Sequence, residues 1–181
     1  MSELRLDEQL QQIVADAKES TGVPALDPIN QPMIRHWCDA IVDDNPVYTD
    51  PELAAQSSFG EIVAPPTMLQ AWTMGGLGAR RRMAARAAAS DSSRNPMAIL
   101  DDAGYTSVVA TDCEQDYHRY LKLGDVLTVT SRLESISSEK QTALGPGYFV
   151  TNLHTHRDQN GEVVAEMRFR ILKFKPPSAV G

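Results

Sequence analysis

Residues 38–69 read CDAIVDDNPVYTDPELAAQSSFGEIVAPPTML, and the rest of the chain is organised around them. Residues 43–50 cluster three aspartates around an Asn-Pro turn, and residues 62–67 end in Pro-Pro-Thr before an apolar segment. Proline suits the first position of a helix because its missing N–H would be unpaired there. We therefore expect a helix to begin at Pro66 or Thr67, with its first free amides turned back toward the aspartate loop.

The segment that follows, TMLQAWTMGGLG (67–78), carries no charge, which is typical of a buried helix. Its candidate core residues are Met68, Leu69, Trp72, Met74 and Leu77.

Four later segments are rich in β-branched and aromatic residues, which favours strands: 106–120, 126–136, 148–157 and 163–174. Short breaks separate them, and Asn160-Gly161 is a strong signal for a two-residue hairpin turn. This pattern predicts an antiparallel meander with one face buried against the apolar helix. The expected fold is therefore α+β, a single curved antiparallel sheet wrapped around a central apolar helix.

Apolar periodicity predicts a helix in residues 3–20 and a second helix from about Asn30 to Ile41. A short helix is expected at about 51–56. The expected organisation is an N-terminal helical extension (1–25), one domain (26–175) and a tail (176–181).

The composition of the chain argues against two classes of function, nucleic-acid binding and membrane association. The chain has 181 residues, 42% of them apolar, and a net charge of −7, which argues against a nucleic-acid surface. It contains no run of eighteen apolar residues and no apparent secretory signal, so we expect no membrane association. Its two cysteines, Cys38 and Cys113, lack metal-binding spacing and are expected to be reduced thiols in a cytoplasmic protein.

An Arg- and Ala-rich insertion at about 79–96 holds five arginines and one aspartate. Arg80 and Arg81 could form a clamp for phosphate groups, because arginine binds phosphate bidentately. The alternative, which we favour, is a solvated insertion. His154 and His156 share a sheet face, but no further ligand lies near them in sequence; we expect a polar sheet face rather than a metal site.

The pattern Asp43-x-Asn45-Pro46-x-Tyr48-x-Asp50, followed by Phe-Gly and an apolar helix, resembles the signature D-x-N-P-x-H-x-D of MaoC-like (R)-specific enoyl-CoA hydratases and dehydratases. In that hot-dog family the Asp and His handle water and proton across the enoyl double bond. Here Tyr48 stands in the place of the His, and a phenol near pKa 10 is a poor proton shuttle. Pro66 falls at or beside a Gly whose N–H would serve the thioester oxygen. The resemblance thus implies a retained frame that has lost its chemistry.

Motifs in order along residues 26–175 narrow the resemblance: Asn30-Gln31-Pro32-Met33-Ile34, Ala64-Pro65-Pro66-Thr67-Met68, Asp101-Asp102-Ala103-Gly104-Tyr105, Cys113 to Tyr120, and Arg170 to Phe174. Together they resemble the MaoC-like domain of the larger, non-catalytic subunit of heteromeric enoyl-CoA hydratases that degrade sterol side chains.

This resemblance implies a small catalytic MaoC-like partner in a heterodimer or heterotetramer and a steroid acyl-CoA substrate. Coenzyme A enters as part of the substrate, with no separate cofactor and no metal. A thiolase-like aldolase docks on a zinc-binding and OB-fold module in many relatives, and we expect that function not to be encoded in a chain that stops shortly after Pro177. The candidate substrate-binding residues are therefore Asn45, Tyr48, Pro65, Thr67 and Trp72, together with Arg80 and Arg81 of the possible phosphate clamp.

Two alternatives stay open. The chain could be an active (R)-specific hydratase, with Asp43 as base and Tyr48 or His36 as acid. It could also be an acyl-CoA-binding scaffold without catalysis. The aspartates themselves have a simpler role available, because Asp side chains terminate helices and cap turns.

Overall fold

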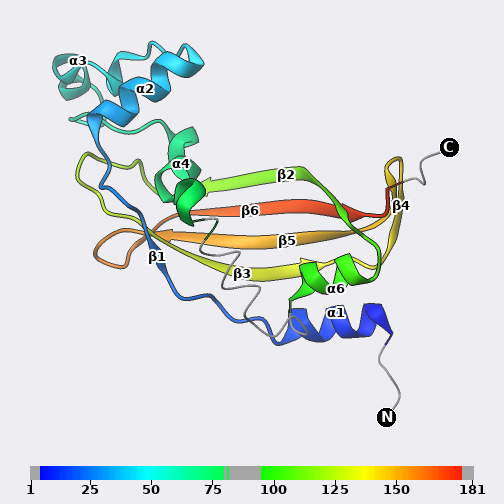
Figure 1. The fold of residues 1–181 in the computed structure, drawn as a ribbon. Coiled ribbons are helices and arrows are strands. Elements are labelled where there is room, and N and C mark those ends of the chain that lie inside the picture. Colours follow the sequence, from blue (N-terminus) through cyan, green and yellow to red (C-terminus); the bar gives the residue numbers. More distant parts are fainter. Residues whose placement is uncertain (1–4, 80, 82–94, 177–181) are drawn as a thin grey trace.

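The computed structural model describes residues 5–79, 81 and 95–176. Its centre is a six-stranded antiparallel sheet in the order β1-β3-β5-β6-β2, with β4 paired to β5 (Figure 1). The strands are β1 (Val23–Pro24), β2 (Ser107–Tyr117), β3 (Thr128–Ile136), β4 (Lys140–Thr142), β5 (Gly145–Arg157) and β6 (Val163–Phe174). The four long predicted strands are confirmed, and β1 and β4 are short additions. The α+β hot-dog fold is confirmed, with a sheet that stays open.

The order of the strands is not the predicted meander. β3, β5 and β6 are neighbours, but β2 pairs with β6 at the far edge of the sheet instead of with β3. The connection from β2 to β3, residues 118–127, therefore has to cross the end of the β5–β6 hairpin. Local sequence patterns predict strands but not which strand lies beside which, because strand pairing is set by contacts between residues far apart in sequence.

The β5–β6 turn lies where Asn160-Gly161 predicted it, but it is larger than two residues. Asp158 N–H donates to the Glu162 carbonyl at 2.9 Å, and Gly161 N–H donates to the Asp158 carbonyl at 3.0 Å. Gly161 has φ +82°, a left-handed conformation that glycine adopts without strain. The loop therefore has three residues and ends in a left-handed glycine.

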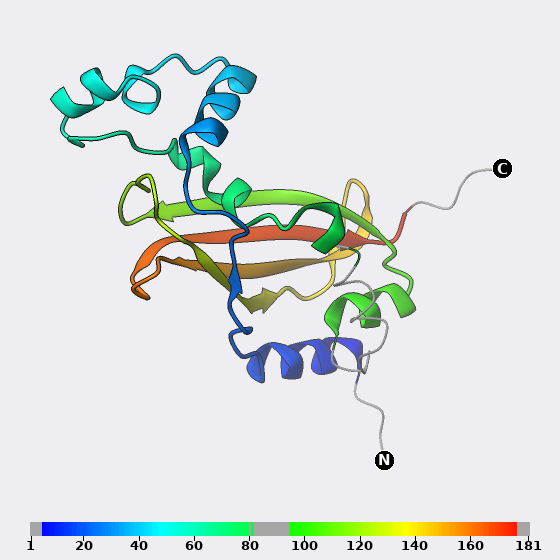
Figure 2. The ribbon, with the colours of Figure 1, turned by 60° about the vertical axis from the view of Figure 1, so that its left-hand side comes forward.

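Helices α2 (Gln31–Ile41) and α3 (Pro51–Gln56), with the 3₁₀ turn η1 (Pro46–Tyr48) between them, form a lobe beyond one end of the sheet (Figures 1 and 2). Asn30 caps α2 by accepting from Met33 N–H, as expected of Asn before a helix. Asp50 caps α3 by accepting from two backbone amides, those of Glu52 and Leu53. Both predicted helices are confirmed within a few residues.

The expected long central helix is interrupted. A 3₁₀ turn η2 (Pro66–Met68) leads into α4 (Leu69–Thr73), residues 74 and 75 are not helical, and the chain is helical again over residues 76–79. Met68, Leu69 and Trp72 are buried as predicted, whereas Met74 and Leu77 are 64% and 62% exposed, so their core prediction is wrong. The Gly75-Gly76 pair explains the break, since glycine is a poor helix former and Gly76 adopts φ +65°.

Helices α1 (Leu6–Ala15) and α6 (Pro96–Asp102) lie together over the opposite end of the sheet (Figures 1 and 2). Their Leu10 and Leu100 are fully buried in one cluster with Tyr105, Ile136, Tyr148 and Val150. Tyr148 Oη also donates to the Asp7 carboxylate at 2.7 Å, which ties α1 to β5. The predicted N-terminal helix is confirmed but shorter than 3–20, and α6 was not predicted. In the described part of the chain, every helix is too short or too polar to cross a membrane.

Candidate functional site

The aspartate loop begins where α2 ends. Val42 closes the helix in the left-handed conformation (φ 58°, ψ 45°), and Asp43 N–H donates to the Cys38 carbonyl at 2.9 Å. The Asp43 carboxylate accepts from Asn45 N–H at 3.1 Å, and the Asn45 side chain accepts from Val47 N–H at 3.3 Å. Asp43 and Asn45 thus both serve the turn, which is the simpler role that the sequence left open for the aspartate.

Tyr48, in the position of the family's His, is only 9% exposed. Gln31 Nε2 donates to its backbone carbonyl at 2.9 Å and ties the loop to α2. Burial raises the pKa of the Tyr48 phenol, and the neighbouring Tyr120 and Asp43 raise it further. The phenol is therefore protonated at neutral pH. It can donate a hydrogen bond, but it cannot accept a proton from water as a neutral histidine can.

Two aromatic residues that sequence reasoning missed complete this surface. The rings of Tyr120 and Phe59 lie with centroids 4.5 Å apart, and Tyr120 is close enough to Tyr48 to affect its pKa. Tyr117 and Tyr120 line a cavity of about 20 Å³ together with Pro66, Leu69 and Ala165. That volume is room for about one water molecule and not for a thioester. The available signal was the Tyr-x-x-Tyr spacing at the end of a predicted strand, but nothing in it indicates a role.

The turn at Pro66 offers few backbone donors. Pro66 has no N–H, and the amides of Met68 and Leu69 donate to the carbonyls of Pro65 and Pro66. An oxyanion needs donors aimed at the oxygen that gains charge. At position 66 and at the two amides that close this turn, no such donor is free.

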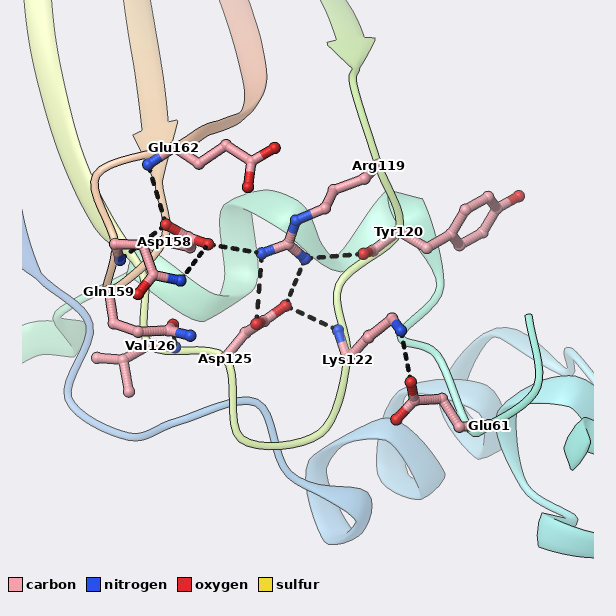
Figure 3. Close-up of polar contacts among 10 residues, drawn as sticks. Glu61, Arg119, Tyr120, Lys122, Asp125, Val126, Asp158, Gln159 and Glu162 are labelled. Carbon is pink, nitrogen blue, oxygen red and sulfur yellow. Dashed lines mark hydrogen bonds and ion pairs between the residues drawn. The ribbon is translucent and has the colours of Figure 1, made fainter.

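Arg119 secures the loop that carries Tyr120 (Figure 3). Its guanidinium donates to Asp125 at 2.6 Å and 3.3 Å, to Asp158 at 3.0 Å and to the Tyr120 carbonyl at 3.0 Å. Asp125 and Asp158 also accept backbone N–H bonds, from Lys122 and from Asn160 and Glu162. These contacts fasten the crossing connection to the β5–β6 turn, so the aromatic surface beside Tyr48 rests on a fixed backbone.

The remaining predicted binding residues are spread out. Trp72 is buried in the core, Thr67 is exposed, and Pro65 is buried beneath the turn. Arg81 is exposed, while Arg80 lies outside the described residues, so the phosphate-clamp prediction stays a prediction. His36 is exposed on α2, and in the described part of the chain no hydrogen bond joins it to Asp43 or Tyr48.

His154 and His156 do not lie on a polar face, and that expectation is wrong. They lie on the face that α4 covers: His156 is 1% exposed, with its Nε2 3.5 Å from Thr73 Oγ1. Burial, and then the neighbouring His154, lower the pKa of His156 to about 4. Among the described residues no cluster of His, Cys, Asp or Glu is arranged to hold a metal ion.

Comparison with known proteins identifies the domain. The family model described as FAS1-like, dehydratase domain region, matches residues 20–167. The chain is 51% identical over 150 residues to the "Probable enoyl-CoA hydratase alpha subunit" of Thermomonospora curvata, covering 83% of this chain and 46% of that protein. It is 48% identical over 160 residues to the 3-oxo-4,17-pregnadiene-20-carboxyl-CoA hydratase alpha subunit of Mycobacterium tuberculosis, covering 86% of this chain and 49% of that protein. The chain thus spans about half the length of these curated relatives.

Superposition on solved structures supports the same family. A chain in the crystal structure of the ChsH1-ChsH2 complex from Mycobacterium tuberculosis superposes with a TM-score of 0.80 at 42% identity, covering 97% of this chain and 94% of that chain. A chain of the HadBC (3R-hydroxyacyl-ACP dehydratase) complex from the same organism superposes with a TM-score of 0.57 at 16% identity. The match covers 86% of this chain and 95% of that chain, and it shows the shared fold. The sequence, the fold and these matches together place the chain in the FAS1-like, MaoC-type dehydratase-domain family.

Proposed function

We propose that this chain is the non-catalytic MaoC-like subunit of a heteromeric enoyl-CoA hydratase acting on steroid acyl-CoA thioesters. A small MaoC-like partner supplies the catalytic Asp and His. This chain completes the assembly and shapes one side of the acyl site.

The observation that carries the proposal is the state of Tyr48. Its buried phenol has a raised pKa, and its neighbour Asp43 is engaged in a backbone turn. The amides of Met68 and Leu69 beside Pro66 are likewise engaged. Acid–base groups contribute about 10²- to 10⁴-fold and an oxyanion donor about 10²- to 10³-fold to rate. With Tyr48 in place of the His and no amide at Pro66, this site lacks the family's proton shuttle and one of its oxyanion donors, and we therefore expect no hydration of an enoyl thioester at a useful rate.

The substrate class and the heteromeric assembly are supported by the relatives. One relative is named the 3-oxo-4,17-pregnadiene-20-carboxyl-CoA hydratase alpha subunit. A second is a chain in the structure of the ChsH1-ChsH2 complex. The open edge strand β2 and the aromatic side chains of Tyr117 and Tyr120 lie together at the end of the sheet nearest α4. A partner that adds its own sheet along this edge would bring its catalytic groups close to this aromatic surface.

The test is a hydration assay with a steroid enoyl-CoA, using this chain alone, the small partner alone and the mixture. We expect no hydration by this chain alone and full activity in the mixture. Steroid enoyl-CoA binding measured with and without this chain separates a subunit that shapes the site from one that only stabilises its partner. Hydration by the purified single chain would contradict the proposal.

A further inference from the structure

Strand β2 is an open edge of the sheet. It runs for eleven residues, pairs with β6 on one side, and is the terminal strand in the order β1-β3-β5-β6-β2. Nearly all of its residues are exposed, including Val108 at 58% and Tyr117 at 42%. A long exposed edge presents unpaired backbone N–H and C=O groups and is a template for another strand, unless its side chains prevent pairing.

The side chains of β2 alternate between two faces. Tyr117 lies opposite Ala165 in the register with β6, and both line the cavity under α4, so this is the helix-covered face. The other face of the sheet, here called the outer face, receives Asp112, Glu114 and Asp116. The edge therefore carries three carboxylates in a row, about 7 Å apart along the strand.

The rest of the sheet neutralises this acidic row only in part. Arg170 reaches Asp112 and Arg168 reaches Asp116, both at 3.5 Å, with the two carboxylate side chains still 59% and 57% exposed. Arg168 is shared with Glu134 at 3.2 Å, and Arg170 donates to Thr151 at 3.2 Å. Glu114 lies opposite Arg168, whose charge it stabilises, but among the described residues it makes no ion-pair contact; Asp116 lies opposite another acid, Glu166. The row keeps excess negative charge at the open edge.

This row opposes pairing of β2 with a second copy of itself. Two copies that form one continuous sheet pair antiparallel about a two-fold axis, so that outer-face residues meet outer-face residues. If the axis passes through Glu114, the two Glu114 side chains meet and Asp112 meets Asp116. A shift by one position either way sets Glu114 against Asp112 or Asp116. Every register centred on residues 113–115 therefore places acids against acids, and directly opposed like charges destabilise a strand pair.

We infer that the acidic row Asp112-Glu114-Asp116 selects the partner of this edge: it rejects a second copy of the chain and accepts an antiparallel strand that carries Lys or Arg at alternate outer-face positions. A groove of about 280 Å³ beside this row is lined by Asp112, Cys113, Glu114, Thr151, Arg168 and Arg170, and it gives the basic side chains room. The inference deepens the proposed heteromeric function, because it explains why the assembly uses two different chains.

Variants of this chain with altered charges on β2 can test which kind of strand pairs with the edge. A charge-neutral variant, D112N/E114Q/D116N, removes the repulsion and is close in shape to the native chain. A charge-reversed variant, D112K/E114K/D116K, presents the expected basic strand. A matched control, D27N/D39N/E52Q, removes three exposed charges that lie outside β2, so its net charge equals that of the neutral variant. Circular dichroism confirms that each variant is folded.

Sedimentation velocity then measures association at equal concentrations. We expect the native chain, the reversed variant and the control to stay equally weakly self-associated. We expect the neutral variant to self-associate about tenfold more tightly, since three like-charge contacts at a few tenths of a kcal/mol each are lost. The native chain mixed with the reversed variant should form a heterodimer that weakens as NaCl rises from about 0.1 M to about 1 M.

Cross-linking locates the contact. Cys113 is an exposed free thiol on β2, whereas Cys38 is buried, so a short bismaleimide should join the two copies of the mixed dimer only through Cys113. A Cys113→Ser change in either copy should abolish the cross-link. The inference is overturned if the neutral variant self-associates no more than the control, or if the native and reversed chains do not pair. Association and hydration are measured separately, so this inference and the proposed function can fail independently.

Discussion

Arg119 Nη2 lies 3.0 Å from Asp158 Oδ2, and this ion pair joins the β2–β3 connection to the β5–β6 turn across 39 residues of sequence. The Asp158 side chain is only 3% exposed and also accepts from the amides of Asn160 and Glu162 (Figure 3). One carboxylate therefore holds together the turn, the crossing loop and the backbone of Tyr120.

Asp158→Ala should lower the midpoint of thermal unfolding clearly, because it leaves two turn amides and a guanidinium without this acceptor. Asp116→Ala is the control, since it removes an aspartate whose ion pair with an arginine is longer and more exposed. Differential scanning fluorimetry on both variants checks the order. An equal effect of the two substitutions would contradict the role given to Asp158.

Low pH should weaken the same contacts of Asp158, because they require the ionised carboxylate. Burial raises the pKa of Asp158, but the amides of Glu162 and Asn160 and the guanidinium of Arg119 outweigh it and hold the pKa below the usual value. A depressed folded-state pKa adds stability above the unfolded pKa of about 3.9, and this stability is lost as the pH falls through the folded pKa. Below about pH 4 the native chain and Asp158→Ala should converge in stability, measured by urea unfolding.

Burial of His156 should make the folding stability depend on pH in a second, higher range. Its pKa is lowered to about 4 in the folded chain, against about 6.5 when unfolded, so the unfolded chain binds more protons between these values. Stability from the neutral buried imidazole is therefore complete above about pH 6.5 and declines toward pH 4, by up to about 3 kcal/mol. Replacement by a non-titrating side chain of similar size, His156→Gln, should flatten the stability profile in this window. Parallel profiles for the two proteins in urea unfolding would contradict the assignment.

Restoring the family's residues tests why the site is silent. Tyr48→His alone should leave the isolated chain without measurable hydration, because Pro66 still provides no amide for the thioester oxygen. Tyr48→His/Pro66→Gly restores both groups and should give a rate above that of the control Tyr48→Phe/Pro66→Gly. A spectrophotometric enoyl-CoA assay measures all three. Activity in the single Tyr48→His variant would mean that the missing amide is not limiting.

The sequence predicts the elements of this fold better than their assembly. The long strands, α2 and α3 carry strong local signals: β-branched residues, the Asn30 cap and the Asp50 cap. Which strand lies next to β2 depends on the crossing loop, which Arg119 fastens to distant carboxylates that no local pattern reveals. The length of the central helix was overestimated because the prediction relied on the apolar composition of residues 67–78 and gave too little weight to the helix-breaking Gly75-Gly76 pair.

The candidate site divides in the same way. Asp43, Asn45 and Tyr48 could be found because they share one short motif, and the structure brings them together in one turn. Tyr120 and Phe59 could not, since they are 61 residues apart in sequence and meet only through the tertiary fold. His156 was misplaced because its polarity suggested an outer face, whereas its position opposite Ala165 puts it under α4.

The most direct test of the central claim is hydration of a steroid enoyl-CoA by the mixture of this chain and a small MaoC-like partner, with and without Asp43→Ala in this chain. If this chain is non-catalytic, the mixture is active, this chain alone is inactive, and Asp43→Ala changes the rate of the mixture by less than about twofold. A loss of about 10²-fold or more on Asp43→Ala would instead show that Asp43 is a catalytic base and that this chain is a catalytic subunit.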